Sequence, residues 1–148
     1  MVDCTVAERN LGCKGGWPSG ALLYIRGVGI ASEEEYPYMG KDGSCKRSGG
    51  KHRIDFVTAS FQCKEMLNDI NDQPIAVTVD ATKWKSYEGG IFNTCSTTLN
   101  HAVLLVGVIQ GNWKVRNSWG TDWGENGFMR LAPGNTCGIC VKAGYYAE

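Results

Sequence analysis

Two polar residues in this sequence have side chains that could act together in proton transfer. His101 precedes a long apolar run, and Asn117 closes a run in which apolar and polar residues alternate. An imidazole exchanges protons near neutral pH, and a carboxamide that accepts a hydrogen bond from one ring nitrogen fixes the orientation of the ring. The pair matches two thirds of a Cys-His-Asn nucleophilic site. The alternative interpretation is a structural pair that only satisfies its own hydrogen bonds inside a sheet.

The segments around the two residues predict a β-hairpin. Residues 102–108 are a continuous apolar run, suited to a strand that is covered on both faces. A tight turn is expected at Gln110-Gly111-Asn112, and residues 113–117 alternate with a period of two. His101 begins the first strand, and Asn117 falls on the apolar face of the second, where a polar side chain needs a partner. The hairpin therefore brings His101 and Asn117 toward each other.

The remaining elements are two helices and a further strand. Residues 17–27 are predicted as a helix, with a proline near its start and a glycine at its end, whereas residues 33–53 are rich in turn-forming residues. A second helix is indicated by one apolar stripe with a spacing of three and four residues, made by Cys63, Met66, Leu67 and Ile70. After Pro74 the pattern changes to alternation over residues 75–80, which predicts a strand.

Composition narrows the class of protein. The 148 residues carry 15 basic and 15 acidic side chains, and no basic run exceeds the pair at residues 46–47, so neither a nucleic-acid partner nor a membrane surface is expected. Seven cysteines favour an oxidising route, to a lysosome or vacuole or to the extracellular space. Because seven is odd, one thiol is free or pairs outside this sequence. No metal or other cofactor is predicted.

The sequence resembles the papain-like cysteine proteases, the cathepsin family, in blocks that follow one another along essentially the whole chain. The densest block runs from Asn117 to Gly127. The other blocks are Val2-Asp3-Cys4, residues 12–18, Tyr36-Pro37-Tyr38, residues 73–77, residues 87–92, residues 100–103 and residues 135–139.

The resemblance implies an α+β papain-like fold. Residues 1–30 are expected to be the remnant of a helical domain, which is therefore only partly present. Residues 31–148 are expected to form a complete β-barrel-like domain that carries the catalytic groups. The resemblance also assigns roles to residues: His101 is the imidazole that shares a proton with a thiolate, Asn117 orients it, and Trp119 shields their hydrogen bond from water. The reaction implied is hydrolysis of peptide bonds in a peptide or protein substrate.

The nucleophilic cysteine that this chemistry requires has no match in the sequence. The family places the catalytic His and Asn about 130 to 150 residues after that cysteine, so it is expected upstream of Met1 or on another chain that pairs with this one. Cys45 follows a Gly-Ser pair, as the family nucleophile does, but Lys46 replaces the expected aromatic residue and no helix pattern follows. This chain alone is therefore expected to be inactive. The alternative function is an inactive, protease-derived module with a structural or binding role in an assembly.

The other cysteines are assigned to disulfides. By position in the family, Cys4 pairs with Cys45 and Cys95 pairs with Cys137, whereas the family partner of Cys13 lies in the absent segment, which leaves Cys13 unpaired. Cys63 and Cys140 are additional to the family pattern, and we predict that they pair with each other. The spacing of Cys137 and Cys140 also fits a redox or zinc motif, but no second cysteine pair or histidine cluster accompanies it.

Substrate-binding residues are also carried over by position. Gly15 and Gly16 are expected to present backbone groups to an extended peptide. The residues expected around the substrate side chains are Trp17, Pro18, Thr78, Leu99, Asn100, Trp119 and Lys142. Thr78 and Lys142 make the predicted pocket polar, which suggests acidic side chains as a preference.

Overall fold

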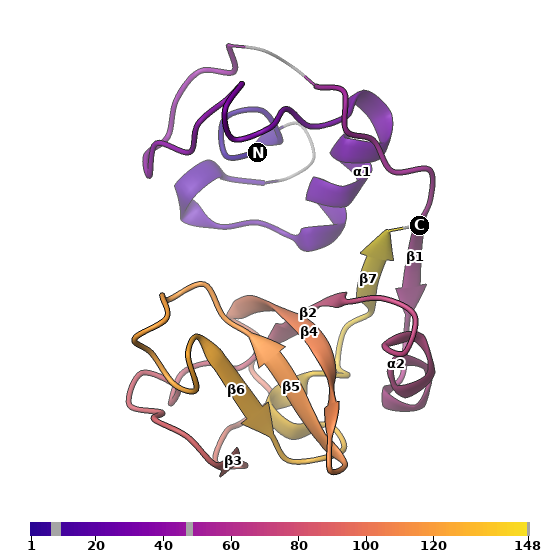
Figure 1. The fold of residues 1–148 in the computed structure, drawn as a ribbon, viewed down its shortest axis with the longest axis vertical. Helices are drawn as coiled ribbons and strands as arrows, with labels where there is room; N and C mark the ends of the chain where they lie inside the picture. Colours follow the sequence, from indigo (N-terminus) through magenta and orange to yellow (C-terminus); the bar gives the residue numbers. More distant parts are fainter. Residues whose placement is uncertain (7–9, 47–48, 148) are drawn as a thin grey trace. The chain divides into compact units, whose positions relative to one another are not determined.

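The computed structural model describes residues 1–6, 10–46 and 49–147. The chain forms two compact units, residues 1–58 with Ala147, and residues 59–146. The elements of the chain can be followed in Figure 1, where the α-helices and the strands are labelled. They are η2 (Gly12–Lys14), α1 (Pro18–Val28), β1 (Val57–Ser60), α2 (Cys63–Asp69), β2 (Ile75–Val79), β3 (Ile91–Phe92), β4 (His101–Ile109), β5 (Asn112–Arg116), β6 (Phe128–Leu131), η3 (Thr136–Gly138) and β7 (Gly144–Ala147).

The first unit is built around α1, the helix expected near residues 17–27. Pro18 occupies its first turn, where a missing amide proton costs nothing, and Gly29 ends it with a φ of 82° while its amide donates to the carbonyl of Ile25. The Trp17 amide donates to Asn10 Oδ1 at 2.7 Å, which supplies an acceptor at the exposed start of the helix. The sequence pattern therefore placed this helix within one residue at each end.

The strands form a sheet with the order β1-β7-β2-β4-β5-β6-β3, of which β2 to β6 lie wholly in the second unit. The pairs β2–β4, β2–β7, β4–β5 and β5–β6 are antiparallel, and β3 pairs with β6 in the parallel direction. In Figure 1 the strands β4, β5 and β6 follow one another across this sheet. Because β1 and β3 are distinct edges, the sheet is open. The fold is α+β as predicted, but its strands do not close into a barrel.

The β4–β5 hairpin has the turn that the sequence predicts. Gln110 and Gly111 have φ values of 51° and 80°, and two consecutive positive values match the twist of paired strands. The register pairs Leu105 with Val115, and an irregularity follows between Leu105 and Gly107. The run at residues 102–108 was expected to be covered on both faces, and that expectation is wrong, because Ala102 and Val108 are exposed.

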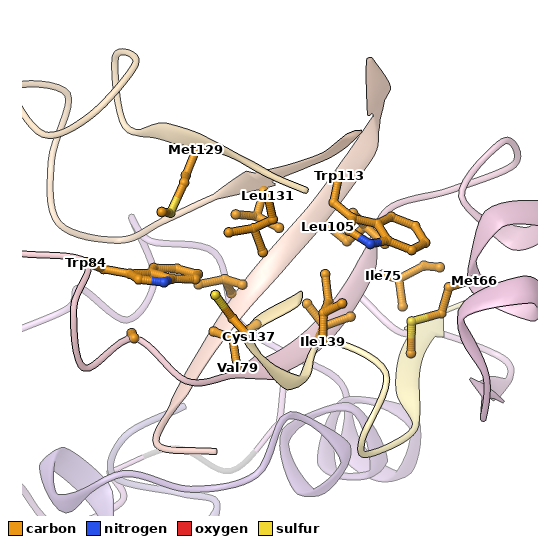
Figure 2. Packing of buried hydrophobic residues seen from close by; sticks show 14 of the residues in the cluster. Met66, Ile75, Val79, Trp84, Leu105, Trp113, Met129, Leu131, Cys137 and Ile139 are labelled. Atoms are coloured by element: carbon orange, nitrogen blue, oxygen red, sulfur yellow. The ribbon is translucent and has the colours of Figure 1, made fainter. Parts of the chain in front are cut away.

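The hydrophobic core lies between the sheet and the segments that cover it. Figure 2 shows its largest side chains, and those with no exposed surface are Met66, Ile75, Val79, Trp84, Leu105, Val115, Met129, Leu131 and Ile139. Met66 comes from α2 and points toward Ile75. In the predicted stripe of this helix Leu67 departs from the pattern, since 44% of it is exposed. The helix is short, so one narrow face of it is buried.

The chain has three disulfides, and each of them links segments of a single unit. Cys4–Cys45 lies in the first unit, and Cys63–Cys140 and Cys95–Cys137 lie in the second. These are the pairs expected from the sequence. Cys63–Cys140 connects the start of α2 to the segment before β7, and Cys95–Cys137 connects the loop before β4 to η3. Cys13 has a free thiol and is exposed.

Two further expectations concern the chain as a whole. The assignment of residues 1–30 to one domain and 31–148 to another stays a prediction. The two compact units describe only how the residues of this chain pack, and they divide it after Thr58. Among the described residues, no helix combines the length and the apolar character needed to cross a membrane.

Candidate active site

The hairpin brings His101 and Asn117 into direct contact. His101 is the first residue of β4, and Asn117 directly follows β5, which pairs with β4 in the antiparallel direction. His101 Nε2 lies 2.8 Å from Asn117 Oδ1. Asn117 is 8% exposed, and its backbone amide donates to the carbonyl of Gly127. The contact predicted from the sequence is therefore present. The hydrogen bond to Gly127 fixes the backbone of Asn117, from which the carboxamide extends.

The surrounding hydrogen bonds define which imidazole nitrogen is free. The Ser118 amide donates to Asn117 Oδ1 at 2.8 Å, which identifies that atom as the oxygen. Because the oxygen only accepts, His101 Nε2 must carry the proton that it donates. The neutral ring is thus held in one tautomer, and its Nδ1 is the nitrogen that remains able to take up or release a proton.

Aromatic rings surround the imidazole. Trp119 stacks on His101 with ring centroids 5.1 Å apart, and Trp84 meets His101 edge to face at 6.2 Å. Trp123 lies edge to face against Trp119 and donates its indole proton to the carbonyl of Trp84. Trp119 is the residue expected to shield the histidine, and it remains 43% exposed. Sequence reasoning did not identify Trp84, since a buried tryptophan in a loop carries no signal of its neighbours.

Two buried polar atoms in this region have no hydrogen-bond partner among the described residues. They are Asn117 Nδ2 and Trp84 Nε1. The unpaired donor of Asn117 lies on the same carboxamide that binds His101, so its orientation depends on the Oδ1 contacts alone. A buried donor without an acceptor costs free energy, and such groups are concentrated at functional sites.

A buried carboxylate lies next to the start of β4. Asp80 follows β2, is 2% exposed, and accepts hydrogen bonds from the amide and hydroxyl groups of Ser96 and Thr82. These hydrogen bonds, from Ser96 first and then Thr82, hold the pKa of Asp80 far below its ordinary value. Asn100 joins the same network. The sequence showed Asp80 only as the end of an alternating strand and did not indicate these partners.

A second charged network holds the loop before β3 against β6. Glu125 accepts two hydrogen bonds from Arg130 Nε at 3.0 Å and one from Arg130 Nη2 at 2.6 Å, and it also accepts from the Gly90 amide. The bonds from Arg130 lower the pKa of Glu125. Tyr87 donates to the carbonyl of Gly90 and accepts from the Arg130 amide, and burial raises its pKa.

The lowered pKa of Glu125 predicts a defined pH dependence of stability. The free energy of unfolding that the carboxylate adds is complete above its unfolded pKa of about 4.3 and is lost as the pH falls through its lower folded value. We expect Glu125→Gln to cost about 1 kcal/mol near neutral pH, because the pair is partly exposed, and less at about pH 3. Urea unfolding at both pH values measures the difference, with exposed Glu88→Gln as the control. A cost that is equal at the two pH values contradicts the assignment.

The cysteines of this chain are poor nucleophiles. Six of them are in disulfides, and the remaining thiol belongs to Cys13. Loss of hydration, the hydrogen bond with Asp42 and the charges of Asp42 and Asp3 raise the pKa of Cys13. Raising the pKa lowers the fraction of reactive thiolate, which is the opposite of what nucleophilic catalysis needs.

The predicted substrate-binding residues fall on both units. Gly15, Gly16, Trp17 and Pro18 belong to the first, where Gly15 has a φ of 103° and Trp17 is half exposed. Thr78, Leu99, Asn100, Trp119 and Lys142 belong to the second. Asn100 and Trp119 adjoin His101, as described above, and Thr78 is buried with a hydroxyl that has no partner in the described part of the chain. Lys142 is exposed. Their assembly into one pocket stays a prediction.

Comparison with known proteins agrees with this fold. The model of the papain family cysteine proteases matches residues 1–147. Cathepsin L 2 of Paramecium tetraurelia is 43% identical over 98% of this chain, which covers 47% of that protein. The chain spans just under half the length of this and the other curated relatives ranked with it.

Solved structures show the same likeness. A cysteine protease of Carica candamarcensis in complex with E-64 has a TM-score of 0.90 and 33% identity, covering 99% of this chain and 73% of that chain. Procathepsin L 3 of Tenebrio molitor has a TM-score of 0.87 and 36% identity, covering 99% of this chain and 53% of that chain. The chain therefore belongs to the papain family of cysteine proteases. That family is one of hydrolases that cleave peptide substrates with a thiol.

Proposed function

We propose that this chain provides the histidine and the asparagine of a Cys-His-Asn endopeptidase site. His101 is the proton carrier, Asn117 orients it, and the nucleophilic cysteine lies outside residues 1–148, upstream or on a separate chain. The observation that carries the proposal is the 2.8 Å contact of His101 Nε2 with Asn117 Oδ1, since it leaves Nδ1 as the nitrogen that faces the chemistry.

The proposed reaction proceeds through an acyl-enzyme. The thiolate attacks the carbonyl carbon of the scissile peptide bond, and imidazolium His101 donates its Nδ1 proton to the leaving amine as the C–N bond breaks. Neutral His101 then accepts a proton from water, which attacks the thioester and releases the acid product. The acid leaves as the C–S bond breaks, and the expelled thiolate re-forms the ion pair with the imidazolium that the proton from water produced. Asn117 keeps Nε2 occupied in both halves, so that one nitrogen performs both proton transfers.

The stacked indole of Trp119 supports this assignment. A ring over the imidazole keeps water from competing for the Asn117 contact, and its π face attracts a cationic imidazolium. Trp119 is thus proposed to act on the histidine as well as at the edge of the substrate site.

For the substrate we propose an extended peptide that pairs with the backbone of Gly15 and Gly16. The residues proposed around its side chains are Trp17, Pro18, Thr78, Leu99, Asn100, Trp119 and Lys142. The buried, unpaired hydroxyl of Thr78 and the exposed charge of Lys142 favour polar or acidic substrate side chains over purely apolar ones. No cofactor takes part in the proposed reaction. The three disulfides support action in a lysosome, a vacuole or the extracellular space.

Labelling of the natural protein tests the proposal. E-64 is bound in the related Carica candamarcensis structure and serves as the probe. We expect the protein isolated from its source to hydrolyse peptides, to lose that activity with E-64, and to carry one adduct at a cysteine outside these 148 residues. A natural protein that takes no adduct and cleaves no peptide contradicts the proposal.

The alternative is an inactive module derived from a protease. It is favoured by one observation, that six cysteines are in disulfides and the pKa of the seventh is raised. In that case the intact mass of the natural protein corresponds to these residues alone, with no associated chain that bears a cysteine. The mass and the E-64 adduct therefore discriminate the two functions.

A further inference from the structure

Asp80 is a buried charge that the proposed reaction does not use. Its Oδ1 accepts from the Thr82 amide at 3.0 Å and from the Thr82 hydroxyl, and its Oδ2 accepts from the Ser96 amide at 2.8 Å and the Ser96 hydroxyl at 2.6 Å. Both amides can only donate, so each oxygen of Asp80 must accept. A charge at 2% exposure is costly unless it is hydrogen-bonded in this way, and such bonds are short and strong.

The network extends from Asp80 to the residue before His101. Asn100 Nδ2 donates to Thr82 Oγ1 at 2.8 Å and lies 3.4 Å from Asp80 Oδ1. Asn100 Oδ1 accepts from the Ala81 amide at 2.9 Å, so the side chain is held at both ends. The Asn100 amide donates to the carbonyl of Val79, and Val79 is the register partner of His101.

Ser96 anchors the loop that leads into the same strand. The adjacent Cys95 is bonded to Cys137, and the carbonyl of Cys137 accepts from the Asp80 amide at 2.8 Å. The loop is thus tied to Asp80 through Ser96, and Asp80 is tied to η3 through its own backbone. These contacts converge on the first residue of β4, where a small rotation of the backbone moves the imidazole away from Asn117.

We propose that Asp80 is a positioning residue for His101: it holds Asn100 and the start of β4 so that His101 Nε2 meets Asn117 Oδ1. This inference rests on the proposed function of the same site. Asp80 acts through Ser96, Thr82 and Asn100 and does not touch the reacting atoms. Its loss should therefore alter the state of the imidazole and the turnover of substrate, in addition to any loss of stability.

The test compares two substitutions of the same kind. Asp80→Asn replaces one accepting oxygen by an amide that points a proton at a backbone N–H. Asp69→Asn is the matched control, because Asp69 also accepts a short hydrogen bond from a serine, 2.6 Å from the Ser60 hydroxyl. Asp69 is the last residue of α2, whereas the disulfide-bonded Cys63 is the first. Ser96→Ala is a milder variant that removes one hydroxyl donor, and Ser96→Thr is its conservative counterpart.

The first readout is the tautomer of His101 in the 148-residue chain, from the nitrogen chemical shifts of the ring at about pH 8, above the ordinary histidine pKa. The sequence has two histidines, so assignment is simple. We expect a single Nε2–H tautomer in the unsubstituted chain, in Asp69→Asn and in Ser96→Thr. Asp80→Asn should give a mixture of both tautomers, and Ser96→Ala a smaller change in the same direction.

The second readout is peptide hydrolysis by the natural, complete protein. Asp80→Asn is expected to lower kcat about 10- to 100-fold and to leave KM within about twofold, since misplacement of a catalytic group affects the chemical step. Asp69→Asn should change neither constant.

A folded Asp80→Asn chain with the His101 spectrum of the unsubstituted chain overturns the inference. If Asp80→Asn does not fold, Ser96→Ala decides: an unchanged tautomer overturns the inference, and a mixture that Ser96→Thr reverses supports it. If the unsubstituted protein hydrolyses no peptide, the proposed function fails, whereas the tautomer comparison still tests the positioning of His101 by itself.

Discussion

Substitution of His101 by alanine should lower kcat/KM of the complete protein by at least about 10³-fold. The imidazole is proposed to protonate the leaving amine and then to activate water, so its loss removes a group from both halves of the reaction. It also removes the cation that stabilises the thiolate. Hydrolysis of a peptide substrate, measured with the concentration of folded protein held equal, gives the effect.

The control for this substitution is the other histidine. His52 is exposed in the first unit and contributes its backbone to a bridge with Ile30. Because that bridge uses main-chain groups, His52→Ala should leave kcat/KM within about twofold of the unsubstituted protein. Equal activities of the His101 and His52 variants would show that His101 is not the proton carrier.

The largest loss of stability is expected for Leu105→Ala. Leu105 lies at the centre of β4, has no exposed surface, and pairs with Ile75 on one side and Val115 on the other. Removing a fully buried leucine side chain costs its transfer free energy and leaves a cavity that packed neighbours fill only partly, so the free energy of unfolding should fall by about 2–5 kcal/mol. Urea unfolding followed by tryptophan fluorescence measures this change.

A leucine outside the core provides the comparison. Leu67 belongs to the same unit, but 44% of its surface is exposed on α2. Leu67→Ala should change the free energy of unfolding by less than about 0.5 kcal/mol beyond the small effect of helix propensity. If the two substitutions cost the same, the core does not lie where the buried side chains in Figure 2 place it.

Local signals in the sequence were sufficient for the pair and for the hairpin that carries it. Positive φ values at Gln110 and Gly111 are required by a tight turn between twisted strands, and the glycine marked its place. The alternation that ends at Asn117 indicated the buried face of the second strand. Both signals depend on residues within one hairpin, so no knowledge of distant packing was needed.

The environment of the pair depends on contacts that the sequence does not encode locally. Asp80 reaches Ser96 across a long loop, and Trp84 reaches His101 from a segment without regular structure. Alternation in β2 predicted that the side chains of Asp80 and Val79 point to opposite faces of the sheet. It did not predict that both side chains would be buried. Burial on the second face comes from loops whose path is fixed by the Cys95–Cys137 disulfide and by Asp80 itself.

The apolar run in β4 illustrates the converse error. Continuous apolar residues suggested cover on both faces, yet Ala102, Val108 and Ile109 are exposed. Hydrophobicity alone does not determine which face of the sheet a side chain occupies. The observed register places Val103 and Leu105 on the face toward the core. Likewise, Leu67 met the spacing of an apolar stripe but lies at the margin of a helix that buries a narrow face.

The pH dependence of thiol alkylation tests most directly whether His101 serves a cysteine outside this chain. In the complete protein, where Cys13 is expected to pair with its family partner, iodoacetamide should label one cysteine through a thiolate that persists well below the ordinary thiol pKa of about 8.5. In the same protein with His101→Ala, the onset of labelling should move up to that ordinary value. If alkylation follows the same pH curve with and without His101, the histidine does not share a proton with a thiol, and the proposed site is contradicted.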